Sequence, residues 1–148
     1  MNQTVAQLVV ISGRSGSGKS TALHVLEDLG YYCIDNLPAS LIPNLVDRSK
    51  QQKLSAKIAV SIDARNSAAD LEDFPLAITQ IQDFDVRVIF LDAASPTLIK
   101  RFSETRRKHP LSTQEMGLKE ALNVESQLLD GLAMMASLKI DTTHMTLH

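Results

Sequence analysis

A glycine-rich stretch near the N-terminus is the feature that most constrains how this chain can fold. Residues 13–20 read Gly-Arg-Ser-Gly-Ser-Gly-Lys-Ser, which satisfies the spacing G-x-x-x-x-G-K-S/T. The stretch follows the apolar run Leu8–Ile11 and leads into a helical pattern over Lys19–Leu29, which Gly30 is well placed to end. A buried strand, a tight glycine turn and a helix in this order predict a phosphate-binding loop inside an α/β fold.

The residue types in this stretch suit the binding of phosphate groups. Its glycines let the backbone turn so that successive amide N–H groups point at phosphate oxygens, and the helix N-terminus adds partial positive charge. The Lys19 ammonium can reach the β- and γ-phosphates, and the Ser20 hydroxyl can bind magnesium. The alternative is a glycine-rich connection without a ligand. We expect a purine nucleoside triphosphate, bound with Mg²⁺ by Gly13, Arg14, Ser15, Gly16, Ser17, Gly18, Lys19 and Ser20.

Apolar runs that fit buried strands recur along the chain. They are Leu8–Ile11, Tyr31–Ile34, Ile58–Ile62, Val86–Leu91 and Leu138–Ile140. Helical patterns separate them, and an alternation of strands and helices is typical of a mainly parallel sheet covered on both faces. Together with the glycine loop, this predicts an α/β P-loop fold of the nucleoside-kinase type, with a five-stranded, mainly parallel sheet.

The later helices are predicted from apolar periodicity and from residues that favour helix starts. A weak pattern covers Leu71–Ile81, where Pro75 indicates a short or irregular start. Ser95, a capping residue followed by a proline, begins the next helix. Ser112 and Glu115 have the spacing of a capping box at the head of one long amphipathic helix.

Composition is that of an ordinary globular domain. The chain has 148 residues, 44% of them hydrophobic and 22% charged, which suits a single domain over residues 1–148. The net charge of −2 argues against a protein that grips nucleic acid over its whole surface. There is no run of ~20 apolar residues and no signal-peptide pattern, and Cys33 is the only cysteine, so we expect a cytoplasmic protein away from the membrane.

Two carboxylates follow predicted strands and are candidates to hold magnesium, directly or through water. Asp63 follows Ile58–Ile62, and Asp92 follows Val86–Leu91. Either could instead cap a turn at the surface. We favour Asp63, because Asp92 lies shortly before the helix that starts at Ser95, where loop capping accounts for an acidic residue.

The only basic cluster consists of Arg101, Arg106, Arg107, Lys108 and His109. In small P-loop kinases the corresponding stretch is a lid whose arginines close over the phosphates. On that interpretation Arg106 acts on the phosphates together with Lys19 and Asp63. The alternative is a solvated helix end, where cations complement the helix dipole. Weak contact with RNA is a third interpretation, although no aromatic residues interleave with the charges.

Asp35 and Asn36 follow the second predicted strand, near the place where small P-loop kinases bind the acceptor substrate. They could equally form a turn before Pro38. The alternative function is therefore a small-molecule kinase, in which Asp35 or Asp63 orients an acceptor hydroxyl that receives the γ-phosphate of ATP.

Four segments beyond the glycine loop read as a set. They are Asp35-Asn36-Leu37-Pro38, Ser61-Ile62-Asp63-Ala64-Arg65-Asn66, Phe90-Leu91-Asp92-Ala93 and Thr105-Arg106-Arg107-Lys108-His109-Pro110-Leu111. With the glycine loop they resemble the N-terminal domain of the RapZ/YvcJ family, the RNase adapter proteins of bacteria. The resemblance extends over nearly the whole chain, and the first and last of the four segments are its most specific parts.

The resemblance implies a kinase-like P-loop domain that binds ATP and GTP and hydrolyses them weakly. By motif match, Gly13–Ser20 would bind ATP, and Asp63, Ala64, Arg65 and Asn66 match the family stretch linked to GTP. In enterobacterial members the protein delivers a small regulatory RNA to an endoribonuclease and so controls amino-sugar synthesis, mainly through a C-terminal RNA-binding domain. Family members also self-associate. We expect residues 1–148 to be the N-terminal domain of such a longer protein.

Overall fold

The computed structural model describes residues 6–52, 57–64, 68–81, 84–105, 109–111 and 117–145. Within these residues the centre of the fold is a sheet with the strand order β2-β3-β1-β4-β5, in which every pairing is parallel. The strands are β1 (Ala6–Gly13), β2 (Tyr32–Ile34), β3 (Lys57–Ile62), β4 (Phe84–Asp92) and β5 (Leu138–Asp141). The predicted five-stranded sheet is confirmed, and it is wholly rather than mainly parallel.

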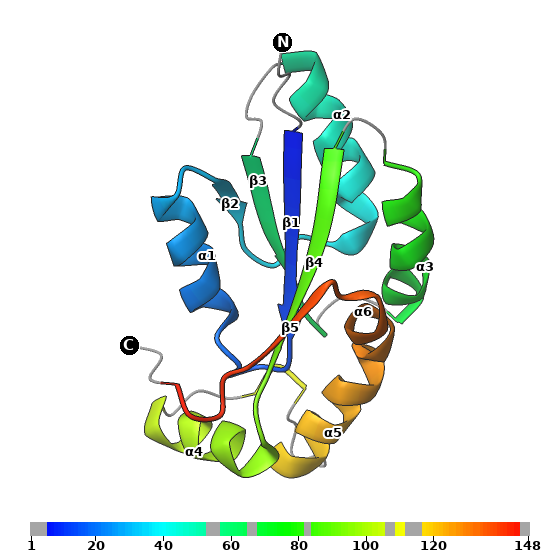
Figure 1. Ribbon diagram of the computed structural model, residues 1–148. Coiled ribbons are helices and arrows are strands. Elements are labelled where there is room, and N and C mark those ends of the chain that lie inside the picture. The colour runs from blue at the N-terminus through cyan, green and yellow to red at the C-terminus, as the bar shows by residue number, and fades with distance from the viewer. Residues whose placement is uncertain are drawn as a thin grey trace.

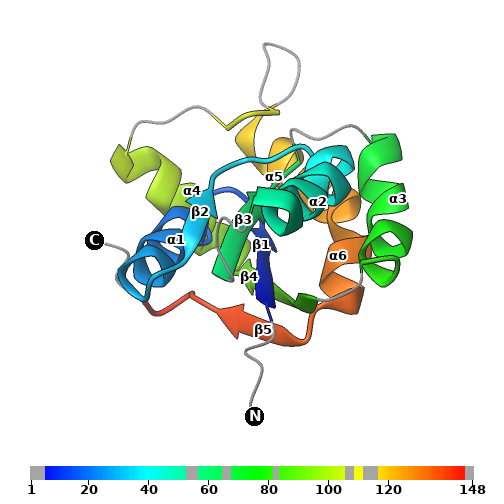
Figure 2. The same cartoon turned by 90° about the horizontal axis from the view of Figure 1, so that it is seen from above.

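Helices cover both faces of this sheet (Figure 1). They are α1 (Lys19–Asp28), the short 3-10 helix η1 (Ala39–Leu41), α2 (Ile42–Gln52), α3 (Ala68–Thr79), α4 (Ser95–Thr105), α5 (Leu118–Leu128) and α6 (Asp130–Met135). Seen from above, α1 lies on one side of the sheet, and α2, α3 and α6 lie on the other (Figure 2). Helices α4 and α5 lie beyond the carboxyl ends of the strands (Figure 1).

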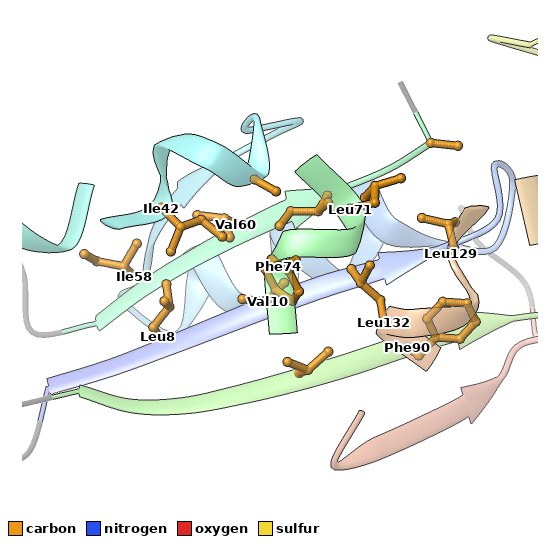
Figure 3. Packing of buried hydrophobic residues seen from close by; sticks show 14 of the residues in the cluster. Leu8, Val10, Ile42, Ile58, Val60, Leu71, Phe74, Phe90, Leu129 and Leu132 are labelled. Atoms are coloured by element: carbon orange, nitrogen blue, oxygen red, sulfur yellow. The ribbon is translucent and has the colours of Figure 1, made fainter. Parts of the chain in front are cut away.

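Side chains of β1 alternate between the two faces because successive residues of a strand point in opposite directions. Leu8 and Val10 belong to the larger core cluster, which includes residues of α2, α3 and α6 (Figure 3), whereas Val9 and Ile11 pack toward α1. Burial of one such side chain stabilises the fold by about 1.5–3 kcal/mol. Because both faces of the sheet are covered at β1 and β3, these two strands read as largely apolar runs.

The order of the strands reverses at the end of β1. This strand lies between β3 and β4, so the chain must cross the sheet between them. Gly13 ends β1, while Asp63 follows β3 and Asp92 ends β4 on either side of it. In open parallel sheets, ligands bind in the crevice at such a reversal. The fold therefore places the glycine loop and both candidate carboxylates at the position where ligands of such sheets bind.

Helix α3 is longer than Pro75 led us to expect. It runs from Ala68 to Thr79 with Pro75 in its interior, so the expected short or irregular start is wrong. A proline at this position removes one backbone hydrogen bond of the helix. Leu71 and Phe74, however, are buried in the larger core cluster, and this packing holds the helix on the sheet.

The expected single long helix is divided into α5 and α6. Helix α5 starts at Leu118 with Gly117 as its N-cap, and Leu129 separates the two helices with φ −93° and ψ 1°. The Leu129 side chain is buried in the larger core cluster, and the bend lets α6 pack on the sheet while α5 contacts α4. The expected capping residues Ser112 and Glu115 lie outside the described residues.

Cys33 lies in β2, where its thiol donates a hydrogen bond to the Leu23 carbonyl at 3.3 Å. Burial, and then the negative charge of Glu27, raise the pKa of this thiol. A raised pKa disfavours the reactive thiolate, which agrees with a structural role for the residue. In the part of the chain that the structure describes, no helix is long and apolar enough to cross a membrane.

Candidate functional site: the phosphate-binding loop

The glycine loop leaves the carboxyl end of β1 with almost no space for side chains at its first position. Gly13 has φ +150°, and a Cβ added to it would lie 2.0 Å from the Leu91 carbonyl oxygen of β4. Gly18, with φ +113°, turns the backbone into α1 in a left-handed conformation that residues with a Cβ rarely adopt. The sequence therefore uses glycine where the loop passes close to β4 and where it enters the helix.

The N-terminus of α1 is open to an anion. Gly18, its N-cap, has no side chain that could cap the helix, and the first turn, Lys19–Ala22, carries no acidic residue. The first amide groups of a helix lack partners within the helix, and together with the helix dipole they attract negative charge. The Lys19 ammonium donates hydrogen bonds to the carbonyls of Gly13, at 2.8 Å, and Arg14, at 3.3 Å. A full positive charge therefore lies on the loop beside the helix end.

Two carbonyls on the later part of the loop accept hydrogen bonds from residues that lie far away in the sequence. Arg101 of α4 donates from Nη1 to the Gly16 carbonyl at 2.8 Å, and the Thr142 hydroxyl donates to the Ser17 carbonyl at 2.7 Å. Arg101 also donates to the hydroxyl and the carbonyl of Thr142. The loop, α4 and the segment after β5 are thus joined into one network. Sequence reasoning gave Thr142 no role at the loop, because no local pattern indicates it.

Arg14 is directed away from the helix end and toward the end of β4. The residue is 8% exposed, and its Nε donates to the Asp92 carboxylate at 2.9 Å. The remaining guanidinium donors reach the Ala93 carbonyl at 2.7 Å and the Ser95 hydroxyl at 3.0 Å. Arg14 therefore fastens the start of the loop to β4 and α4, and Ser95 is the first residue of α4.

The two candidate carboxylates have different surroundings. Asp92 forms an ion pair with Arg14 and accepts a hydrogen bond from the Ala93 amide at 2.8 Å. These contacts match the interpretation that Asp92 caps the loop before α4. Asp63 lies on the other side of β1 and is 4% exposed. Next to it, the Ser12 hydroxyl donates to the Ile62 carbonyl at 2.7 Å and ties β1 to β3. The assignment of magnesium to Asp63 stays a prediction.

The segment after β2 is fastened to β3. The Ser61 hydroxyl donates to the Asp35 carboxylate at 2.5 Å and accepts a hydrogen bond from the Asn36 amide at 2.7 Å. Asn36 has φ +53°, a left-handed conformation that asparagine tolerates, so the segment turns sharply here. The turn interpretation is thus realised, and it holds the Asp35 carboxylate at the same edge of the sheet as Asp63.

The predicted site residues fall into three groups. Residues 13–20, Asp63 and Asp92 are brought together around the end of β1. Ala64, which directly follows Asp63, forms the second group: its side chain lies in the larger core cluster. Arg65, Asn66, Arg106, Arg107 and Lys108 lie outside the described residues.

His109, which the sequence placed in the basic cluster, is buried and not part of a solvated helix end. The residue is 2% exposed, and its Nε2 lies 2.9 Å from Oε1 of Glu125 on α5. The same carboxylate accepts hydrogen bonds from the amide and the hydroxyl of Ser15, each at 2.7 Å. Sequence reasoning missed Glu125. Its signal was a lone acidic residue on the apolar face of α5, one turn after Ala121 and Leu122.

A parallel sheet of this strand order, with a glycine loop between its central strand and α1, defines a P-loop domain with a kinase-like fold. The chain belongs to the family of RapZ-like N-terminal domains, whose model matches residues 6–148. It is 55% identical over 148 residues to a nucleotide-binding protein of Hahella chejuensis, and 53% identical over 146 residues to one of Pseudomonas aeruginosa (strain LESB58). Each match covers 96% of this chain and 51% of the relative, so the chain spans about half the length of these proteins.

Solved structures support the fold independently of the family. The chain is similar to the crystal structure of a gluconokinase from Sinorhizobium meliloti, with a TM-score of 0.56 and 16% sequence identity. The similarity covers 98% of this chain and 87% of the gluconokinase chain. At this identity the similarity concerns the fold alone, and it agrees with the predicted kinase type of the P-loop fold.

Proposed function

We propose that this domain binds ATP or GTP, with magnesium, at the loop formed by residues 13–20. The observation that carries the proposal is the uncapped N-terminus of α1, with the Lys19 ammonium held on the loop beside it. A chain of phosphates is the ligand whose charge and oxygen acceptors suit such a site. The names of the Hahella and Pseudomonas relatives, both nucleotide-binding proteins, support the same ligand class.

The residues proposed to hold magnesium are Ser20 and Asp63, directly or through water. Ser20 is exposed on the first turn of α1, and Asp63 follows the strand next to β1. A hydroxyl and a carboxylate are the oxygen ligands that magnesium prefers, so these residue types fit the ion. A bound magnesium ion would neutralise part of the phosphate charge.

The proposed role is that of a cytoplasmic regulatory module with slow ATP or GTP hydrolysis at most. Lys19, Asp63 and Arg106 are the residues proposed to act on the phosphates, and Asp63, Ala64, Arg65 and Asn66 are those proposed to contact GTP. The last assignments rest on the family resemblance. In the longer protein of which this domain would be the N-terminal part, nucleotide state would control an RNase adapter that handles a small regulatory RNA.

A titration of nucleotide binding tests the proposal. Fluorescent ATP and GTP analogues with magnesium should bind the wild type, and Lys19→Ala should weaken binding by about tenfold or more, because a charge-assisted contact is lost. Lys119→Ala, which removes an exposed lysine of α5, is the matched control and should bind as the wild type does. Absence of binding by the wild type, or equal binding by Lys19→Ala, would contradict the proposal.

A small-molecule kinase is the second candidate. It is favoured by the position of Asp35, which Ser61 holds at the sheet edge that also carries Asp63. Phosphoryl transfer from labelled ATP to a pool of hydroxyl metabolites, abolished by Asp35→Ala, would favour the kinase. Nucleotide binding without any transfer would favour the regulatory module.

The RNA partner and the endoribonuclease are proposals for the longer protein. Direct contact of RNA with this domain through Arg101 and the residues after α4 predicts an affinity that falls steeply with salt. Comparison of RNA binding by this domain and by a relative of full length, at several salt concentrations, separates the two contributions. RNA binding by the full-length protein alone would place the contact in the part that this chain lacks.

A further inference from the structure

A buried carboxylate lies under the phosphate-binding loop and is not used in the nucleotide chemistry proposed above. Glu125 has a fully buried side chain on α5. Three hydrogen bonds, from the Ser15 amide, the Ser15 hydroxyl and His109, converge on its two oxygens. Both donor groups of Ser15 therefore point at one carboxylate, which fixes the orientation of the backbone at this position of the loop.

The hydrogen bonds determine which atoms carry protons. The Leu111 amide donates to Nδ1 of His109 at 3.0 Å, so Nδ1 has no proton and Nε2 donates to Glu125. Burial would raise the pKa of Glu125, but the hydrogen bonds from His109 and Ser15 outweigh it and hold the pKa below its ordinary value. The carboxylate is therefore ionised at neutral pH and acts as an acceptor only.

Packing alone does not account for an acidic residue at this position. Glu125 shares a helix face with Ala121 and Leu122, and Leu122 packs with Phe102 of α4 in an apolar cluster. Burial of a carboxylate carries a large desolvation cost, and apolar residues of similar volume are often as stabilising or more so. The groups that match the carboxylate are the donors of Ser15 on one side and His109 on the other.

We propose that Glu125 is a positioning residue that holds the phosphate-binding loop at Ser15 and couples it, through His109, to Leu111. The proposal rests on nucleotide binding at this loop. Because the loop is fixed at Ser15, the backbone amides that follow Ser15 are already oriented before a nucleotide binds. This order lowers the entropy cost of nucleotide binding. Because the Leu111 amide donates to His109, and His109 donates to the Glu125 carboxylate, a change at the loop is transmitted to residues 109–111.

Substitution of the carboxylate tests the positioning role. Glu125→Gln keeps the shape of the side chain but removes its charge and leaves one acceptor oxygen for the three donors of Ser15 and His109, so the network loses its charge-assisted hydrogen bonds. We expect a magnesium-nucleotide Kd weaker by about tenfold. Glu120→Gln, on the exposed face of the same helix, should bind as the wild type does. Wild-type affinity in Glu125→Gln, with Lys19→Ala still impaired, would overturn this inference and leave the proposed function intact.

Two substitutions of His109 test whether the bond between His109 and Glu125 contributes to nucleotide binding, beyond any effect on the stability of the fold. Glutamine can donate near the position of Nε2 and so keep the bond to Glu125, whereas asparagine can accept near Nδ1 and keep only the bond from Leu111. His109→Gln should therefore bind nucleotide within about threefold of the wild type, and His109→Asn should be as weak as Glu125→Gln. The opposite order, or equal affinities, would overturn the coupling.

Amide hydrogen exchange provides the readout that a merely structural residue would not change. Nucleotide should slow exchange of the His109 and Leu111 amides in the wild type but not in Glu125→Gln. In the free proteins, exchange should be faster in residues 13–20 of the variant and unchanged in β1 and β3. Faster exchange throughout the sheet, with the nucleotide response of residues 109–111 retained, would show that Glu125 only stabilises the fold and would overturn the proposal.

Discussion

Arg14, the second residue of the phosphate-binding loop, forms an ion pair of 2.9 Å with Asp92 at the end of the neighbouring strand β4. The pair joins the loop to the sheet, because Arg14 is 8% exposed and its guanidinium also donates to the Ala93 carbonyl and to Ser95. It also gives the Asp92 carboxylate a structural function at the start of α4.

Replacement of Arg14 by alanine should destabilise the fold by about 2–3 kcal/mol, because it removes three hydrogen bonds and the partner of Asp92. Asp92→Asn should cost less, since the Asp92 side chain is 42% exposed and the new amide still accepts a hydrogen bond. In urea unfolding, the double variant should reveal a coupling energy of about 1 kcal/mol. Additive effects of the two substitutions would show that the ion pair contributes nothing beyond its separate contacts.

The ion pair between Arg14 and Asp92 also leads us to expect that Asp63 and Asp92 contribute differently to nucleotide binding. Asp63→Asn should reduce the gain in nucleotide affinity that magnesium provides by about tenfold, because it removes a charged oxygen ligand. Asp92→Asn should leave that gain nearly unchanged. Titrations of a fluorescent ATP analogue with and without magnesium measure both. A larger effect in Asp92→Asn would reverse the assignment of the metal ligand.

Most of the fold was predictable because its signals are local. Strands such as Ile58–Ile62 are covered on both faces and therefore read as apolar runs, whose predicted bounds agree with β3 to within one residue. The glycine loop was recognised for a related reason: its backbone needs glycine at positions such as Gly13, and the requirement appears directly in the sequence.

The contacts that hold the loop were not predictable, because each joins residues far apart in the chain. Arg14 occupies a variable position of the motif, and nothing in its neighbourhood indicates Asp92, 78 residues later, as its partner. Glu125 gave only a weak signal, a charge on an apolar helix face. The break at Leu129 was hidden because the apolar pattern continues through it, and only the sheet under α6 requires the bend.

Addition of one methyl group to a glycine should have an effect that depends on the position of that glycine in the fold. Gly13→Ala would bring a Cβ to 2.0 Å from the Leu91 oxygen and 2.7 Å from the Ser17 hydroxyl oxygen. It should cost more than about 4 kcal/mol or prevent folding, since backbone must move. Gly117→Ala is the control, because no atom of the described residues, its chain neighbours aside, lies within 4 Å of the added Cβ, and it should change stability by about 0.5 kcal/mol or less. Thermal and urea unfolding measure both, and a well-folded Gly13→Ala would contradict the close approach of β1 and β4.

Acid should reduce the stability that Glu125 contributes. Hydrogen bonds from His109 and Ser15 hold the pKa of this buried carboxyl below its ordinary value of 4.5. A depressed pKa in the folded state means that the unfolded state binds the proton more readily. The stability contributed by the ionised Glu125 is therefore present above pH 4.5 and is lost as the pH falls through the folded-state pKa.

Urea unfolding from pH 7 to pH 3 tests this expectation. The difference in free energy of unfolding between the wild type and Glu125→Gln should shrink in acid. Carboxylates common to both proteins cancel in this difference, so an advantage that stays constant or grows in acid would show that the carboxyl is not stabilised in its ionised form.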